Sequence, residues 1–200
     1  MNGRATAEIA AVAARLVVEE GLEYGPAKRK AARMLGRSAA RGGAMPDNDD
    51  IEDEVRSYLA LFHADTQPAE LDALRRVALD WMQRLAEFRP HLTGAAWRGT
   101  ATRLSSVHIE LFCDDPKSAE IALINQGVRF AAVGTGGSSG GSGSALSLQA
   151  PSAELGEPVT VVLTILDHDD LRGALRPDHR GRSERGDRSA LQRLIAQERA

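Results

Sequence analysis

Apolar residues in the first 90 positions recur at the three- and four-residue spacing that places them on one face of a helix. In residues 6–21 this set consists of Ile9, Val12, Ala13, Leu16 and Val17. The same spacing predicts a second helix over residues 27–35, which begins after a proline and stops at a glycine. It predicts a third helix that starts at the acidic cluster 47–50, and a fourth that starts at residues 66–70.

From residue 91 onward the pattern changes to short alternating or wholly apolar runs, which are typical of strands. Strands are predicted over residues 91–97, 107–112, 128–133, 145–150 and 159–166, and the last is apolar enough to lie centrally in a sheet. Helices are predicted over 118–126 and 189–198, whereas 171–188 is loop-like. The sequence therefore predicts an α+β protein. Its helical N-terminal region (1–88) is followed by a domain with a small mixed sheet and a C-terminal helix (89–200).

Two segments carry no apolar pattern, and both are predicted to be loops. Residues 37–46 are rich in small and basic residues. Residues 134–144 contain only Gly, Ser and Thr, so they cannot pack a core and predict a flexible connection between two strands. Their composition resembles an engineered linker, and the sequence leaves open whether it is natural or replaces a hairpin loop. We assign no function to it.

The composition excludes several classes of protein. Hydrophobic residues make up 42% and charged residues 26%, which excludes wholesale disorder, and a net charge of −3 argues against a uniformly basic nucleic-acid binder. The single cysteine, Cys113, excludes an internal disulfide and a cysteine-based zinc finger. We find neither a run of about 18 apolar residues nor a secretory pattern at the N-terminus, and therefore expect a soluble, cytoplasmic protein with no membrane partner.

The segment 92–111 carries the most informative set of polar residues. Ser106, His108 and Glu110 alternate with apolar residues in a predicted strand. Residues at i and i+2 of a strand point to the same face, so these three side chains share one face. Such a polar triplet is either part of a site or the solvent-facing side of a sheet.

This segment resembles the signature of the nucleotidyltransferase superfamily, which has the DNA polymerase β-like fold. The signature is a Gly-Ser pair after a helix, then commonly Arg-Gly, then Ser before an Asp-x-Asp on a strand. Here the corresponding positions are held by Gly94-Ala95, Arg98-Gly99 and Ser105. The whole chain also looks like a group of proteobacterial proteins of this type.

An ungapped register places Ser106 and His108 where the family has its two carboxylates, and Thr160 is the best counterpart of the third. Serine is a poor Mg²⁺ ligand, and histidine prefers borderline metals such as Zn²⁺. A register two residues later instead takes His108 and Glu110 as the pair, which restores one carboxylate. Both registers remain open at the level of sequence.

The resemblance implies a catalytic set of Ser106, His108 and Glu110. It also implies a turn that approaches the nucleotide phosphates, formed by Gly94, Ala95, Arg98 and Gly99. We expect a divergent nucleotidyltransferase-like protein that binds a nucleotide or an RNA end, with weak or absent transfer of a nucleoside monophosphate to a hydroxyl. If it is active, the implied cofactor is Mg²⁺, held by His108 and Glu110; otherwise no cofactor is expected.

The alternative is a non-catalytic module that binds a partner protein or RNA through the basic N-terminal helices. Residues 1–44 carry eight basic and four acidic residues, including the cluster Lys28, Arg29, Lys30 and Arg33. A solvated helix surface would explain this cluster equally well. Two acidic segments, Asp114-Asp115 and Asp167-His168-Asp169-Asp170, have the composition of metal ligands. Asp115 also fits the cap of the following helix, and the second segment fits an acidic cap before a short turn.

Overall fold

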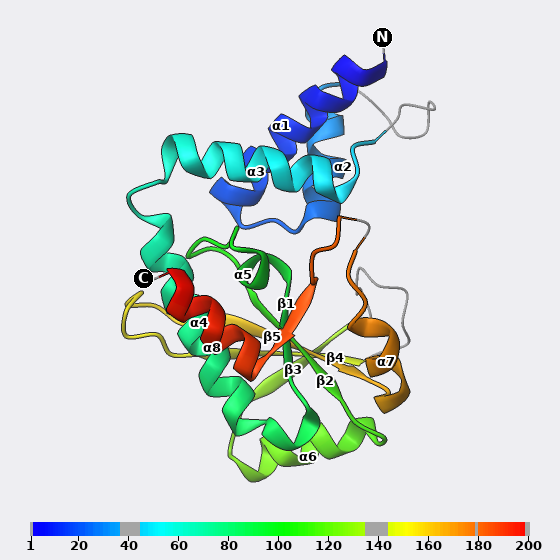
Figure 1. Cartoon of the computed structure of the whole chain (residues 1–200), viewed down its shortest axis with the longest axis vertical. Helices are drawn as coiled ribbons and strands as arrows, with labels where there is room; N and C mark the ends of the chain where they lie inside the picture. The colour runs from blue at the N-terminus through cyan, green and yellow to red at the C-terminus, as the bar shows by residue number, and fades with distance from the viewer. Residues whose placement is uncertain (1, 37–44, 135–143, 179, 199–200) are drawn as a thin grey trace. The chain divides into compact units, whose positions relative to one another are not determined.

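The computed structural model describes residues 2–36, 45–134, 144–178 and 180–198, in which the chain forms two compact units (Figure 1). Unit 1 consists of Met1–Ala69 and Thr100–Ser105, and unit 2 of Glu70–Gly99 and Ser106–Ala200. The sequence analysis expected one boundary at residue 88. Of the two predicted loops, residues 37–44 and 135–143 lie outside the described residues.

Unit 1 contains three predicted helices, α1 (Asn2–Glu20), α2 (Tyr24–Met34) and α3 (Asn48–Phe62). The acidic cluster caps α3 as expected, because the Asp50 backbone N–H donates to the Asp47 carboxylate at 2.7 Å and the Asp47 N–H donates to the Asp50 carboxylate at 3.1 Å. The apolar faces of the three helices form a buried core that includes Ala13, Ile51 and Val55.

Helix α1 ends at a glycine that the segment 100–105 approaches closely. Gly21 has φ +66°, and a Cβ placed there would lie 2.6 Å from the backbone oxygen of Leu104. Only a residue without a side chain combines this backbone conformation with this contact. The return of residues 100–105 to unit 1 therefore depends on Gly21.

Unit 2 holds a six-stranded mixed sheet and the remaining helices. Its helices are α4 (Gln67–Arg84, which begins at the unit boundary), α5 (Gly94–Arg98), α6 (Pro116–Asn125), α7 (Leu171–Ala174) and α8 (Arg188–Glu198), and short 3₁₀ turns span Ala86–Phe88 and His168–Asp170. The strands are β1 (His91–Thr93), β2 (Val107–Phe112), β3 (Phe130–Val133), β4 (Ser144–Ala150), β5 (Val159–Leu166) and β6 (Arg185–Asp187).

The strand order is β3-β4-β5-β2-β1-β6, in which β2 and β5 are parallel and every other pair is antiparallel. Strand β5 lies inside the sheet between β4 and β2, which confirms its predicted central position. The α+β class, the mixed sheet and the C-terminal helix predicted from the sequence are also confirmed.

The two faces of the sheet differ in burial. Val107, Ile109 and Leu111 of β2 and every second residue of β5 from Val159 to Ile165 are buried. The intervening residues of β5 are half-buried. Leu74 of α4, Leu123 of α6 and Leu191 of α8 are other fully buried apolar residues of this unit. The other face of β2 carries half-buried His108 together with Glu110 and Phe112, which are both buried.

Two short segments differ from the sequence-based expectation. The strand predicted over 91–97 ends at Thr93, because Gly94 has φ +70° and turns the chain into the five-residue helix α5. The segment 171–188, expected to be a loop, contains α7 and the edge strand β6. Strand β6 has three residues, too few for an alternation to show in the sequence.

Candidate functional site

Strand pairing places the polar residues of β1, β2 and β6 in one row across the sheet. Thr93 of β1 is the register partner of both His108 of β2 and Arg185 of β6, and Val162 of β5 pairs with His108 on its other side. Ser106 directly precedes β2, and by strand alternation it shares a face with His108. The structure therefore places His108 on one face of the sheet together with Thr93 and Arg185.

The turn at the start of α5 lies against the His108 side chain. A Cβ built on Gly94 would be 3.6 Å from His108 Cδ2 and 3.7 Å from its Cβ, which is ordinary van der Waals contact. Ala95 and Arg98 follow within α5, and Gly99 ends this helix with φ +84°. Helix α5 and strand β2 are thus neighbours at this point of the sheet.

Glu110 forms a buried ion pair with Arg185. The Glu110 Oε2 atom lies 3.2 Å from Arg185 Nε, and both side chains are only 10% exposed. Neither atom has a partner with hydrogen-bond geometry among the described residues. Burial raises the pKa of the Glu110 carboxyl, and the positive charge of Arg185 opposes this rise without cancelling it. Glu110 is therefore a desolvated carboxyl that already has a cationic partner.

The residues of this face do not fit a magnesium site. The ungapped register of the resemblance places Ser106, His108 and Thr160 at the ligand positions, and Thr160 accepts a hydrogen bond of 3.0 Å from the Gln149 amide. The later register takes His108 and Glu110. The one carboxylate, Glu110, is bound to Arg185. Within the described ranges, no three His, Cys, Asp or Glu side chains gather in a way that could hold a metal ion. Mg²⁺ prefers several oxygen ligands, so we derive no chemical step through a metal here.

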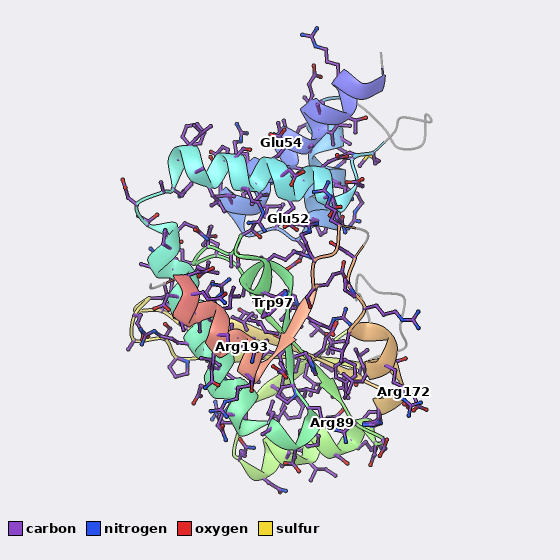
Figure 2. The ribbon with its side chains drawn as sticks, viewed as in Figure 1. Glu52, Glu54, Arg89, Trp97, Arg172 and Arg193 are labelled. Carbon is purple, nitrogen blue, oxygen red and sulfur yellow. The ribbon has the colours of Figure 1, made fainter. Side chains whose placement is uncertain are left out.

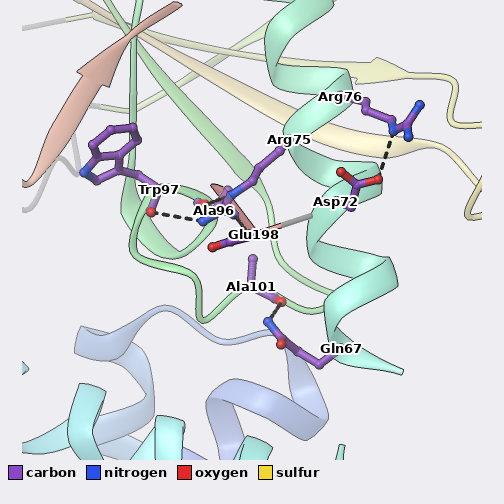
Figure 3. A network of polar contacts seen from close by, with 8 residues as sticks. All are labelled: Gln67, Asp72, Arg75, Arg76, Ala96, Trp97, Ala101 and Glu198. Carbon is purple, nitrogen blue, oxygen red and sulfur yellow. Dashed lines mark hydrogen bonds and ion pairs between the residues drawn. The ribbon is translucent and has the colours of Figure 1, made fainter. Parts of the chain in front are cut away.

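Sequence analysis missed the residues that hold α5 in place. Arg75 of α4 is 1% exposed and donates from Nε to the Ala96 carbonyl at 2.8 Å (Figure 3). Trp97, labelled in Figure 2, donates from its indole N–H to the Ser183 carbonyl at 2.7 Å. The Thr93 hydroxyl donates to the Glu184 carbonyl at 3.0 Å. In the sequence, Arg75 stands among other charged residues of a helix and carries no distinguishing signal.

The two acidic positions with alternative interpretations act as caps. The Asp115 carboxylate accepts from the backbone N–H of Lys117 at 3.0 Å at the start of α6, where Pro116 is the first helical residue. The Asp167 carboxylate accepts from the N–H of Asp169 at 2.8 Å. Both contacts satisfy backbone donors at the start of a helical turn.

The basic cluster of the alternative hypothesis lies on α2 in unit 1. Lys28 Nζ donates to the Pro46 carbonyl at 3.0 Å, and Lys30 pairs with Glu20. Arg29 and Arg33 are exposed on the same helix. Two of the four cations thus make contacts within unit 1.

Comparison with known proteins adds little to this geometry. No family model and no curated protein sequence matches the chain. Solved structures of the Cid1 poly(U) polymerase match weakly: the complex with MgGTP and the complex with the UTP analogue UMPNPP are each 14% identical, with a TM-score of 0.36. The complex with the short product ApU is 15% identical, with the same TM-score. These matches cover 48–50% of this chain, which spans only about a third of the length of the polymerase chains (30–32%). In the described part of the chain, no helix is long and apolar enough to cross a membrane.

Proposed function

We propose that unit 2 binds the phosphates of a nucleotide, or of an RNA end, at the turn that begins with Gly94. In this proposal the protein is a divergent relative of the nucleotidyltransferases, with weak or absent nucleotidyl transfer. The observation that supports it is the proximity of Gly94 to the His108 side chain, which a Cβ placed on Gly94 would approach to 3.6 Å. The glycine turn therefore lies beside β2, the strand that corresponds to the one following this turn in the resembling signature.

The chemistry of the turn suits an anion. A glycine leaves its backbone accessible to a ligand, and backbone N–H groups in a turn are donors to phosphate oxygens. His108 is half-buried beside the turn, and its imidazole can donate a hydrogen bond to the same ligand. Arg98, at the end of α5, adds a positive charge to the same short segment.

The residues that would catalyse transfer support the second half of the proposal. Transfer through metal ions needs several carboxylates on neighbouring strands. At the corresponding positions the chain has Ser106, His108 and Thr160, and Glu110 is bound to a buried arginine. We therefore propose recognition as the main role of this site.

The first experiment measures thermal unfolding with ATP, CTP, GTP or UTP at millimolar concentration. A ligand that binds only the folded protein at about 100 times its dissociation constant stabilises it by about 2.7 kcal/mol, so at least one nucleotide should raise the melting temperature. Absence of a shift with all four nucleotides would contradict the proposal. It would favour the alternative of a non-catalytic module that binds a partner through its basic N-terminal helices, and substitution of the exposed Arg29 and Arg33 in an RNA-binding assay would then test that alternative.

A matched pair of glycine variants locates the binding. Gly94→Ala places a methyl group between the turn and His108, whereas Gly156→Ala changes a glycine of similar φ, +68°, that has nothing within 4 Å of the new methyl group. Both variants carry the same backbone penalty of about 1–2 kcal/mol. Calorimetric titration should show weaker nucleotide binding in Gly94→Ala alone. Equal affinities in the two variants would place the ligand elsewhere.

A further inference from the structure

Helix α5 is too short to fix its own position. It has five residues, Gly94–Arg98, and a helix of this length has more unsatisfied terminal groups than internal hydrogen bonds. Its first residue lies beside the His108 side chain, which a Cβ on Gly94 would approach to 3.6 Å, so any displacement of α5 moves the turn of the proposed site. The position of this turn must therefore be set by groups outside α5.

One buried side chain binds the C-terminal end of α5. The Arg75 guanidinium donates from Nε to the Ala96 carbonyl at 2.8 Å and from Nη2 to the Trp97 carbonyl at 3.4 Å (Figure 3). A cation at this end of a helix also interacts favourably with its terminal carbonyl groups. Gly99, which follows α5 with φ +84°, lies beside the same guanidinium, since a Cβ there would be in ordinary van der Waals contact with Arg75 Nη2 at 3.7 Å.

The remaining side of the guanidinium faces the C-terminal helix. Arg75 Nη1 is bonded to the Glu198 carboxylate at the end of α8. Burial of Arg75 lowers its pKa, and the charge of Glu198 acts in the opposite direction. Glu198 is itself half-exposed, so its part is to orient a guanidinium that α5 and α4 have already buried.

We propose that Arg75 is a positioning residue for the nucleotide site, acting through α5 to hold the Gly94 turn against His108. This inference rests on the proposed function, because it concerns the affinity of that same turn. Arg75 does not touch the ligand. Its guanidinium fixes one end of α5, while the bond from Trp97 to Ser183 fixes the side that faces β6.

The test compares Arg75→Met with Arg76→Met. Arg76 is the next residue of α4, and its guanidinium is half-exposed and pairs with Asp72 at 3.0 Å. Calorimetric titration with the nucleotide that stabilises the wild type should show affinity weakened roughly tenfold in Arg75→Met, about the effect of losing one hydrogen bond to a charged group. Arg76→Met should bind as the wild type does. Arg75→Lys keeps the charge and one bond, so its affinity should fall between those of wild type and Arg75→Met.

Two further measurements separate positioning from general stability. Leu123→Ala removes a fully buried side chain from α6 and should lower the melting temperature while nucleotide affinity stays unchanged. Hydrogen exchange of the amides in residues 94–98 should accelerate in Arg75→Met and not in Arg76→Met. If Arg75→Met is too unstable to study, Arg75→Lys carries the same comparisons.

The outcomes distinguish this inference from the function on which it rests. If the wild type binds no nucleotide, the proposed function and the binding role of Arg75 both fail. If the wild type binds and Arg75→Met binds equally well, only the role of Arg75 is overturned. Equal exchange rates for α5 in Arg75→Met and wild type would also overturn it.

Discussion

Replacement of Gly186 by alanine tests how the edge strand β6 packs against α5. A Cβ on Gly186 would lie 2.2 Å from Cη2 and 2.3 Å from Cζ3 of the Trp97 indole. Real Cβ atoms do not approach a carbon this closely, so either the ring or β6 must move. The ring is held from its other end by the 2.7 Å hydrogen bond from its N–H to the Ser183 carbonyl, and displacement of the ring would break this bond.

The expected loss of stability combines two contributions. Overpacking of a close contact costs about 1–3 kcal/mol, and the broken hydrogen bond adds about 1 kcal/mol. The free energy of unfolding should therefore fall by about 2–4 kcal/mol. At about 2–4 °C per kcal/mol for a chain of this size, the melting temperature should fall by roughly 4–16 °C. Far-UV circular dichroism during thermal unfolding measures this change.

Two controls connect the effect to the indole. Gly134→Ala introduces the same methyl group at an exposed glycine. Gly134, like Gly186, lacks a positive φ, and nothing lies within 4 Å of the new carbon. The melting temperature of this variant should therefore stay close to that of the wild type. Trp97→Leu removes the ring, and Gly186→Ala should then cost far less in this background than in the wild type. Equal costs in both backgrounds would refute the packing argument.

Three further predictions follow from contacts and charges described above. Gly21→Ala should lower the free energy of unfolding, measured in urea, by about 2–4 kcal/mol. The loss combines backbone strain with a carbonyl oxygen 2.6 Å from the new carbon. Gly36→Ala has the same φ of +66° but open space around the new carbon, so it should show the loss from strain alone. Because burial raises the pKa of Glu110, its ionisation opposes folding. The free energy of unfolding should be measured against pH for the wild type and for Glu110→Gln. As pH rises from the pKa of Glu110 in the unfolded chain through its raised pKa in the folded protein, the wild type should lose stability relative to the variant. Parallel curves would contradict this. The double variant Ser106→Asp with His108→Asp should gain Mg²⁺ affinity in calorimetry, and no gain would show that the register of the resemblance is wrong.

The predictions that succeeded from sequence concern single elements. The spacing of apolar residues located α1 and α3, and Asp115 followed by Pro116 marked the start of α6. Alternation located β2 and indicated that Ser106, His108 and Glu110 share a face. These features depend on backbone geometry over a few neighbouring residues, which is why the amino-acid order alone contains them.

The predictions that failed concern elements too short for a pattern. Residues 94–97 were assigned to a strand, although Gly94 turns the chain into α5, and β6 was assigned to a loop. A three-residue strand or a five-residue helix is not stable by itself. Its conformation is decided by partners such as Arg75 and Trp97, which approach from distant parts of the chain.

The sequence by itself determined the helices of the N-terminal region, the positions of the main strands along the chain and the alternation of polar and apolar residues in β2. Only the tertiary structure decided that Glu110 is paired with Arg185, that Gly94 lies beside His108 and that a buried arginine binds α5. The periodicity of apolar residues indicates which side chains become buried, because the face on which a side chain lies depends on local backbone geometry. The contacts between particular side chains depend on how segments distant in the sequence pack onto the sheet. A charged residue such as Arg185 is therefore desolvated and paired only when all of those segments are in place.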